Sequence, residues 1–556
     1  MSLTTHCNEG PRQLPLSTLM LGETTDDGTD EPDPALTAAG KLADTIRTTL
    51  GPSGLDKMVV GENGTVIVTN DGSKIIEWID ITHPVGRLVE QAATAQDSAV
   101  GDGTTTTVVL VGALLEEAAA LRSDGLHPTT IIDGYVRAAE TALDHLEQYE
   151  RSVYSRHDDR LAQIAKTAVT GRWDDTSTER FGELALSALQ AVEFDTSRLT
   201  LKSYPGGELR ESVCLDGVVV DLETSSTSLE ALSHPSIQTH DEPTIGMVDA
   251  EIGIEEPNHI ESVELQDTTQ RSAFQAHEQD RRTELIAQVV QSGATVLFCQ
   301  KSIDEAVRTA LVQRGVLPVE RTRRDEFDVI ARATGSTPVM AVDELTADTT
   351  GTVASVTERT VGTSQTLTLQ GCPEEQRATL LLRGGTPHVA DEVRRIAADC
   401  IDVTRVTLDD GAFVPGGGAV PTALAMDLAA LSSGIPDRTQ LVFEGFGTAL
   451  EAIPRTLATN AGTDPLNTLT GIKQRHDAGA EAIGVGSDGY PRDMIAAGVL
   501  EPSTVFTSAL QRAVAVVTQI LRVDDIVRTT EDGRSTTNEH DHTHAARGGY
   551  PWAVGH

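Results

Sequence analysis

Lysine and aromatic residues are scarce in this chain of 556 residues, while acidic residues are abundant. Phe, Trp and Tyr make up 3% of the sequence, and 84 Asp and Glu stand against 43 Lys and Arg, a formal net charge of −41. Such a surface repels nucleic acid and anionic membranes, so neither is expected as a partner. Two interpretations remain: a soluble protein with an acidic surface, or adaptation to molar salt, which screens self-repulsion beyond about 3 Å. Scarce lysine and diffuse acidity together favour the second.

Paired cysteines and long apolar runs are also missing. No two of the five cysteines form a CxxC pair, which excludes a disulfide framework and a structural zinc of the usual spacing. The N-terminus has no basic-then-apolar signal pattern. The longest apolar stretch, Val108 to Leu115, is too short to span a bilayer. We therefore expect a cytoplasmic protein.

Hydrophobic periodicity divides the chain into two helical blocks around an α/β block. Residues 1–35 are rich in Thr, Asp, Glu and Pro and are expected to be disordered. Helical patterns follow at 36–50, 84–99, 105–121 and 129–150, with two short strands at 57–60 and 65–69. Between residues 213 and 334 strands and helices alternate, and helices return at 420–432, 439–458 and 503–522. This order predicts a helical domain split by an α/β insertion.

Acidic residues stand beside glycines at three places. The most informative is Gly101–Thr107, GDGTTTT, where two glycines permit a tight turn and threonines begin a helix. Unpaired N–H groups and the helix dipole there favour phosphate, and Asp102 could hold Mg²⁺ against it. A polar helix cap is the alternative. No GK[ST] follows, so this is not a Walker A loop. Asp71 in Asn-Asp-Gly and Asp399 on a helix before Gly416–Gly418 indicate, by themselves, only a turn and a solvated face.

Several ordered motifs around these residues resemble the group II chaperonins, the family of the thermosomes and their eukaryotic ring relatives. The similar stretches run from about residue 36 to 530 and include 45–118, LLRGGTPHVADEVRRIAADC (381–400) and DDGAFVPGGGAV (409–420). The acidic composition, together with departures from the family pattern at Arg172 and Phe506, makes the chain similar to a divergent, haloarchaeal-type subunit. The resemblance implies a multi-domain fold of α and α/β parts.

The family architecture implies these limits: an equatorial ATP-binding domain at 36–153 and 410–530, an intermediate hinge domain at 154–220 and 374–409, an apical substrate-binding domain with a lid protrusion at 221–373, and a disordered tail at 531–556. Residues 250–290 are long enough to supply the lid.

The resemblance also assigns roles to single residues. Leu50, Gly51 and Pro52 would pack around the nucleotide, Asp102 would ligate Mg²⁺, and Gly103, Thr104, Thr105 and Thr106 would hold the phosphates. Asp71 and Asp399 would orient and polarise the attacking water, with Asp399 arriving when the hinge closes. Gly417 and Glu501 would contact the ribose and adenine. Arg172 stands where the family has a phosphate-sensing lysine, which keeps the charge but changes its geometry.

The implied function is ATP-dependent folding of unfolded proteins inside a double ring of identical or paralogous subunits, with ATP and Mg²⁺ as cofactors. Phe506, where the family has lysine, and Arg172 keep open a ring subunit with weak or no ATPase. A metabolic kinase is disfavoured because no second small-molecule site is evident. The run His540, His542, His544 is interpreted as a solvated tail. Ile286, Val290, Val307 and Leu311 are interpreted as apical core, with exposed substrate contacts as the alternative.

Overall fold

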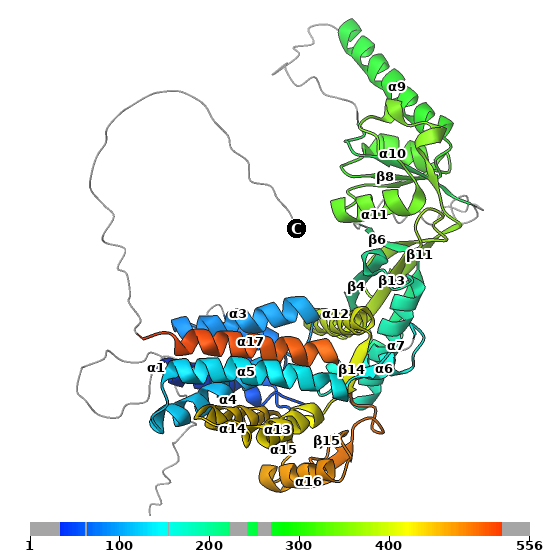
Figure 1. The fold of residues 1–556 in the computed structure, drawn as a ribbon. Helices are drawn as coiled ribbons and strands as arrows, with labels where there is room; N and C mark the ends of the chain where they lie inside the picture. Colours follow the sequence, from blue (N-terminus) through cyan, green and yellow to red (C-terminus); the bar gives the residue numbers. More distant parts are fainter. Residues whose placement is uncertain (1–33, 62–63, 154, 223–241, 254–267, 525–556) are drawn as a thin grey trace, which may run out of the picture.

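The computed structural model describes residues 34–61, 64–153, 155–222, 242–253 and 268–524. Within these residues a helical bundle lies at one end, and two α/β bodies extend from it in succession, so the molecule is elongated (Figure 1). Each part has buried apolar clusters of its own.

The helical bundle unites two stretches that are far apart in the sequence. Its core draws buried residues from 39–149 and again from 414–521. Helix α4 (Thr104–Ser123) is buried on every side from residue 107 to 115, as in an enclosed helix, and packs against α1, α14 and α17. The other helices of this part are α1 (Pro34–Arg47), α2 (Gly72–Trp78), α3 (Pro84–Val100), α5 (Pro128–Leu146), α13 (Ala419–Ser432), α14 (Thr439–Leu450), α15 (Ala452–Asn460), α16 (Pro465–Asp477) and α17 (Ser503–Leu521).

Among the described residues, α4 and α17 are long and apolar enough to cross a membrane by length and composition. Both lie inside the bundle, and 67% and 56% of their apolar windows are buried there. Core helices of globular proteins satisfy the same criteria, so these two helices are weak evidence of a membrane span.

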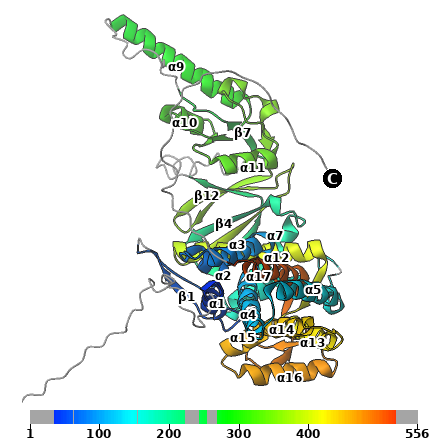
Figure 2. The ribbon, with the colours of Figure 1, turned by 60° about the vertical axis from the view of Figure 1, so that its left-hand side comes forward.

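Three small sheets are attached to the bundle. Strands β1 (Lys57–Val60) and β2 (Val66–Thr69) form an antiparallel hairpin that projects from it (Figure 2). Strand β14 (Ala412–Pro415) pairs with β17 (Leu500–Pro502) and with β3 (Arg151–Ser152). Strands β15 (Ile483–Val485) and β16 (Pro491–Asp493) form a second hairpin. The β14–β17 pairing sets Val414 opposite Glu501, which brings the Gly416–Gly418 turn beside that carboxylate.

The middle body is a three-stranded sheet covered by helices. Its central strand β13 (Ala378–Gly384) is parallel to β4 (Leu199–Pro205) and antiparallel to β5 (Val213–Asp216). Helices α6 (Arg160–Ala168), α7 (Asp175–Ala191) and α12 (Pro387–Asp410) share its apolar core. Helix α12 runs on to the bundle and ends at Gly411. Asp399, on the second half of this helix, therefore lies where the middle body meets the bundle.

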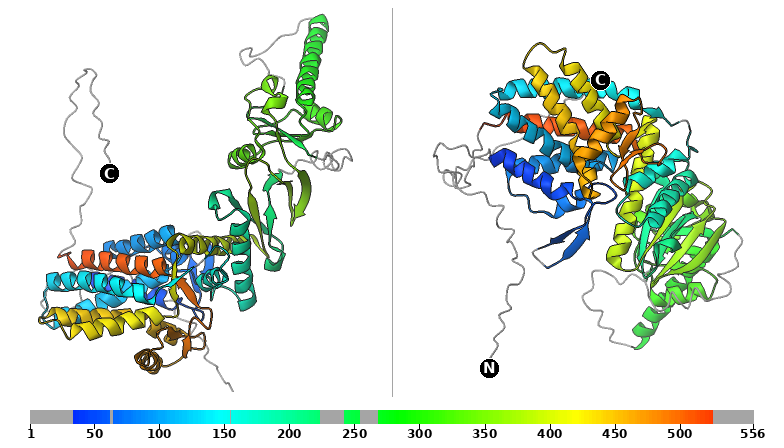
Figure 3. Two further views of the ribbon diagram at one scale, coloured as in Figure 1. Left: turned by 45° about the vertical axis from the view of Figure 1, so that its right-hand side comes forward. Right: turned by 90° about the horizontal axis from the view of Figure 1, so that it is seen from below.

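The outer body contains two sheets. Parallel strands β7 (Thr244–Val248), β8 (Val296–Cys299) and β9 (Leu317–Val319) form one sheet, with β10 (Gly351–Thr352) antiparallel at its edge. The other sheet consists of β11 (Ser355–Val361), β12 (Ser364–Gln370) and β6 (Val218–Leu222). Helices α10 (Glu305–Val312) and α11 (Arg324–Thr334) flank them, and α9 (Thr268–Gln291) projects away from the bundle (Figure 3).

Most helices and strands that the periodicity predicts are present, with ends shifted by a few residues. The helix predicted over 439–458 is wrong in one respect: it is two helices, α14 and α15, which meet at Glu451. The Glu451 carboxylate pairs with Arg455 and Lys473 at this junction. Of the four apolar candidates for substrate contact, Ile286, Val307 and Leu311 are buried, as the core interpretation predicts, whereas Val290 is 42% exposed.

Some predictions fall outside the described residues. They include the predicted disorder of residues 1–33 and 531–556, the tail histidines, and the part of the lid range at 254–267. The predicted disordered segment reached residue 35, whereas α1 begins at Pro34.

Candidate functional site

A cavity of about 450 Å³ opens where the bundle meets α6 and the loop after it. Seven separate stretches of the chain line it, with residues from turns and from helix ends. Every residue predicted for the site except Asp399 is in its wall: Leu50, Gly51, Pro52, Asp71, Asp102, Gly103, Thr104, Thr105, Thr106, Arg172, Gly417 and Glu501. The fold thus gathers into one pocket residues that are up to 451 positions apart in the sequence.

The glycine turn before α4 forms one wall of this cavity. Gly101 and Gly103 have φ angles of 75° and 83°, which favour glycine. The Asp102 carboxylate accepts a hydrogen bond of 2.6 Å from the Gly103 N–H. Gly103 is the N-cap of α4 and supplies no side-chain cap, so the first N–H groups of the helix stay available. With the helix dipole, these donors make an anion site at Thr104–Thr106.

A second wall is the turn after α1. Gly51 has a φ of 81°, and an added Cβ would lie 2.3 Å from Cδ2 of Leu457. Asn460 fixes this turn by donating from Nδ2 to the carbonyls of Arg47 and Leu50, at 2.9 Å each. Gly171 packs against the Gly51 carbonyl, and its own carbonyl accepts a 2.6 Å hydrogen bond from Asn70. The turn that presents Arg172 is therefore held against both neighbouring turns.

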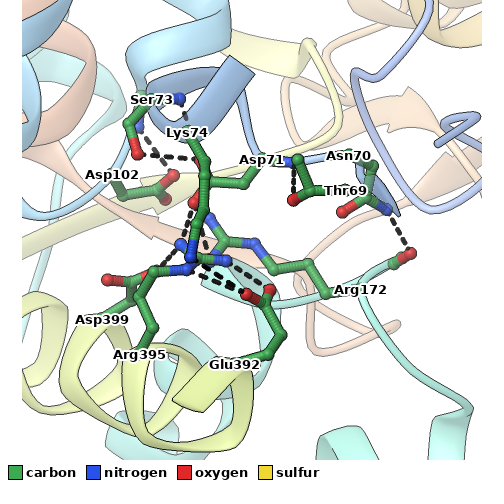
Figure 4. Close-up of polar contacts among 12 residues, drawn as sticks. Thr69, Asn70, Asp71, Ser73, Lys74, Asp102, Arg172, Glu392, Arg395 and Asp399 are labelled. Carbon is green, nitrogen blue, oxygen red and sulfur yellow. Dashed lines mark hydrogen bonds and ion pairs between the residues drawn. The ribbon is translucent and has the colours of Figure 1, made fainter. Parts of the chain in front are cut away.

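Asp71 is almost fully buried and serves as the N-cap of α2. Its Oδ1 accepts hydrogen bonds from the Ser73 N–H at 2.9 Å and the Ser73 hydroxyl at 3.0 Å. Its Oδ2 contacts the Arg395 guanidinium. This carboxylate is held by the bundle on one side and by α12 on the other (Figure 4).

Asp399 is not part of the cavity wall, but two arginines connect it to the site. Its Oδ2 contacts Arg172, which does line the cavity, and lies 3.2 Å from Nη1 of Arg395. Arg172 also lies 3.9 Å from Asp71. The structure thus brings Asp71, Asp399 and the two arginines into one network beside the cavity, with Asp102 nearby (Figure 4).

Burial makes the cavity unfavourable for negative charge. It raises the pKa of Asp102 to about 6, although the charge of Arg172 and the Gly103 hydrogen bond act in the opposite direction. Burial and then the charge of Asp102 raise the pKa of Glu501 to about 7. Burial also raises the pKa of Asp97, another wall residue. A bound cation would relieve this excess of buried carboxylates.

The donor set fits Mg²⁺ held jointly with a phosphate ligand. Among the described residues no group of three or more His, Cys, Asp or Glu could hold a metal alone. Magnesium commonly binds through one or two carboxylates together with substrate phosphates and waters. Asp102, next to the anion site of α4, offers such a carboxylate.

Asp102 should make the stability of the ligand-free protein depend on pH. Its folded pKa of about 6 exceeds the ordinary 3.8, so between these values the folded chain binds a proton that the unfolded chain does not. The free energy of unfolding should therefore rise as pH falls from 7 to 5, by on the order of 1 kcal/mol from this residue. Urea titrations of wild type and Asp102→Asn at both pH values would measure it. Parallel pH profiles of the two proteins would contradict it.

The sequence did not lead us to three charged residues at the site. Asp97 and Arg492 line the cavity, and Arg395 bridges Asp71 and Asp399. Arg395 had a signal, because it lies four residues before Asp399 and thus on the same face of α12. Asp97 had a weaker one, its position one helical turn before the glycine at Gly101. Arg492 had none. It reaches the cavity only because the β15–β16 hairpin folds over the glycine turn after β14.

Comparison with known proteins identifies the family. The model of the TCP-1/cpn60 chaperonin family matches residues 42–531. The chain is 37% identical to thermosome subunit alpha of Halobacterium salinarum over 505 residues, which cover 90% of this chain and 89% of that protein. It is 36% identical to thermosome subunit alpha of Thermoplasma acidophilum, covering 93% and 94%, and 35% identical to thermosome subunit 1 of Haloferax volcanii, covering 96% and 95%. This chain therefore belongs to the TCP-1/cpn60 chaperonin family.

Proposed function

We propose that this protein is an ATP-dependent chaperonin subunit, which binds unfolded proteins and assists their folding in the cavity of a double ring. Three features that meet at one pocket support the proposal. They are the anion site at the glycine turn before α4, the carboxylate of Asp102 beside it, and the ion pairs that connect the pocket to α12. This arrangement suits a magnesium nucleotide whose hydrolysis is sensed by a neighbouring body of the same chain.

Each wall of the cavity has a proposed role in nucleotide binding. Leu50, Gly51 and Pro52 pack against the nucleotide, and Gly103, Thr104, Thr105 and Thr106 hold its phosphates. Asp102 ligates Mg²⁺, which neutralises phosphate charge when bound. Gly417 and Glu501 meet the ribose and adenine, and Arg172 contacts the γ-phosphate. Gly417 lines the cavity with a φ of 63° and has no side chain, which supports close approach of a ligand to its backbone.

Asp71 and Asp399 are proposed to orient and polarise the water that attacks the γ-phosphorus. The bond from that phosphorus to the bridging oxygen then breaks, which leaves ADP and phosphate. Asp71 belongs to the bundle and Asp399 to α12, so both are in place only when these parts are docked. Hydrolysis is thereby coupled to motion of α12 and to closure of the lid.

The domain limits predicted from the sequence belong to this proposal. The equatorial domain would comprise 36–153 and 410–530, the intermediate domain 154–220 and 374–409, and the apical domain 221–373. The core shared by residues 39–149 and 414–521 supports a domain built from both chain ends. The projecting α9 supports a lid element in the apical part.

Partners are proposed to be unfolded proteins and identical or paralogous subunits in the cytoplasm. The β1–β2 hairpin supports a subunit contact, because Met58, Val60, Val66 and Val68 are all more than half exposed. An apolar, projecting hairpin favours burial against another chain. Adaptation to molar salt is proposed from the net charge of −41.

Asp399→Ala tests the coupling of α12 to hydrolysis. We expect kcat for phosphate release by rings purified in molar salt to fall about 100-fold, because a group that polarises the attacking water is lost. The matched control is Asp391→Ala, an exposed aspartate on the same helix, which should leave kcat unchanged. Full activity of Asp399→Ala would argue against the role of Asp399.

A passive ring subunit is the alternative function. Phe506, an uncharged and buried residue in the cavity wall, keeps it open, whereas the similarity to thermosome subunits favours the ATP-dependent function. Rings that form in electron micrographs and bind ATP, but do not hydrolyse it, would establish the alternative. A monomer that forms no rings would contradict both functions.

A further inference from the structure

The Asp71 and Asp399 carboxylates share a single guanidinium nitrogen. Nη1 of Arg395 contacts Oδ2 of Asp71 and lies 3.2 Å from Oδ2 of Asp399 (Figure 4). Asp71 is 324 residues away in the sequence and belongs to the bundle, whereas Asp399 is one turn along α12. Arg395 is therefore the point at which the two proposed water-orienting groups are joined.

Without a cation between them, these carboxylates would repel each other. The side chains of Asp71 and Asp399 are only 4% and 15% exposed, so water screens their charges weakly. Asp97, Asp102 and Glu392 add further negative charge nearby, since burial and then the charge of Asp399 raise the pKa of each of these carboxyl groups. A positive charge at the contact point permits the close approach that water orientation requires.

Arg395 is held from its other side. Its Nη2 and Nε donate to the two oxygens of Glu392, at 2.5 Å and 3.2 Å. Glu392 in turn lies 3.9 Å from Lys74 of α2. A guanidinium bound in this bidentate way has a fixed orientation, so Nη1 points at the two aspartates.

Arg172 duplicates this contact only in part. Its Nη1 contacts Asp399 closely, but its ion pair with Asp71 is longer, at 3.9 Å, and Arg172 is itself part of the cavity wall. Arg395 is absent from the wall, so it reaches a nucleotide only through the aspartates. Replacing Arg172 should therefore affect nucleotide binding, whereas replacing Arg395 should affect turnover.

We infer that Arg395 is a positioning residue for ATP hydrolysis, whose Nη1 holds Asp71 of the bundle and Asp399 of α12 at the distance that orients the attacking water. This inference rests on the proposed function. Since Arg395 acts through the aspartates, its loss lowers kcat and leaves the KM for ATP nearly unchanged.

The test compares Arg395→Gln with Arg394→Gln, an exposed arginine next to it on α12. We expect Arg395→Gln to lower kcat about 30- to 100-fold with KM changed less than about threefold, and Arg394→Gln to match wild type. Arg395→Lys, which restores one bridging nitrogen without the bidentate contact, should recover about tenfold. Ring formation checks that each variant is folded.

The decisive experiment repeats the comparison in a protein that already carries Asp71→Asn. If Arg395 acts through Asp71, adding Arg395→Gln there should lower kcat less than about threefold further. An equal loss in both backgrounds would show a merely structural role, and a raised KM with normal kcat would show a nucleotide contact; either overturns the inference. If Arg395→Gln forms no rings, Arg395→Lys replaces it in the same comparison. An active wild type with an equally active Arg395→Gln overturns only this inference, whereas an inactive wild type overturns the proposed ATPase as well.

Discussion

Asp102→Asn is expected to lower kcat for magnesium-dependent ATP hydrolysis by about 1,000-fold, a larger effect than we expect for Asp399→Ala or Arg395→Gln. Asp102 is the carboxylate beside the anion site of α4, and its buried environment disfavours an uncompensated charge. Asparagine keeps an oxygen that can accept the 2.6 Å hydrogen bond from Gly103, so the turn is preserved and only the charge is lost. A metal that neutralises the transferring phosphate supplies several kcal/mol, which corresponds to a loss of this size.

The same variant distinguishes loss of the metal from loss of the pocket. In EDTA, Asp102→Asn should bind ATP at least as tightly as wild type, because one negative charge facing the phosphates is removed. When magnesium replaces EDTA, the affinity for ATP should rise in wild type and not in Asp102→Asn. Isothermal titration under both conditions measures the difference. An equal gain from magnesium in both proteins would remove Asp102 from the metal site.

Local motifs made part of this site predictable from sequence. The geometry of the turn at Gly101–Thr107 is set by its own residues. Gly101 and Gly103 adopt positive φ angles, and α4 begins directly after them. Physical chemistry alone therefore indicated Asp102 as a candidate Mg²⁺ ligand, with a polar helix cap as the alternative, and the family resemblance favoured the ligand. Asp71 and Asp399 could not be assigned in this way, because a turn aspartate and a helix aspartate acquire a role only when the fold brings them together; there only the family resemblance pointed to them.

The structure adds interactions that no local pattern encodes. Arg395 looks like an ordinary arginine on an amphipathic helix, yet it contacts a carboxylate 324 residues away. Arg492 enters the cavity through the β15–β16 hairpin, which weak periodicity left unpredicted. The break between α14 and α15 at Glu451 did have a signal in the sequence, because Pro454 lacks the N–H that would bond to the Leu450 carbonyl. For Arg395 and Arg492 the missing information was tertiary, and helix propensity could not supply it.

Gly103→Ala should disable nucleotide binding without removing any functional group. A Cβ at Gly103 would lie 2.8 Å from Cγ1 of Val505 and 2.9 Å from Nε2 of Gln96. Gln96 holds the turn by donating to the carbonyls of Asp102 and Val505, at 2.9 Å and 3.2 Å. Displacing it should shift the first N–H groups of α4 away from the phosphates. Hydrogen bonds to charged groups are worth about 1.5–3 kcal/mol, so ATP affinity should fall roughly 10- to 100-fold.

The matched control for Gly103→Ala is Gly125→Ala, because the two glycines flank the same helix with φ angles of 83° and 82°. A Cβ at Gly125 meets nothing within 4 Å, so that variant has the left-handed backbone strain, about 1–2 kcal/mol, without the collision. Thermal unfolding should show some destabilisation in both variants, while ATP titration should show a loss of affinity only in Gly103→Ala. If both bind ATP equally well, the turn before α4 does not hold the phosphates. If both lose affinity equally, strain spread through α4 is the cause, and close packing behind the turn has no part in binding.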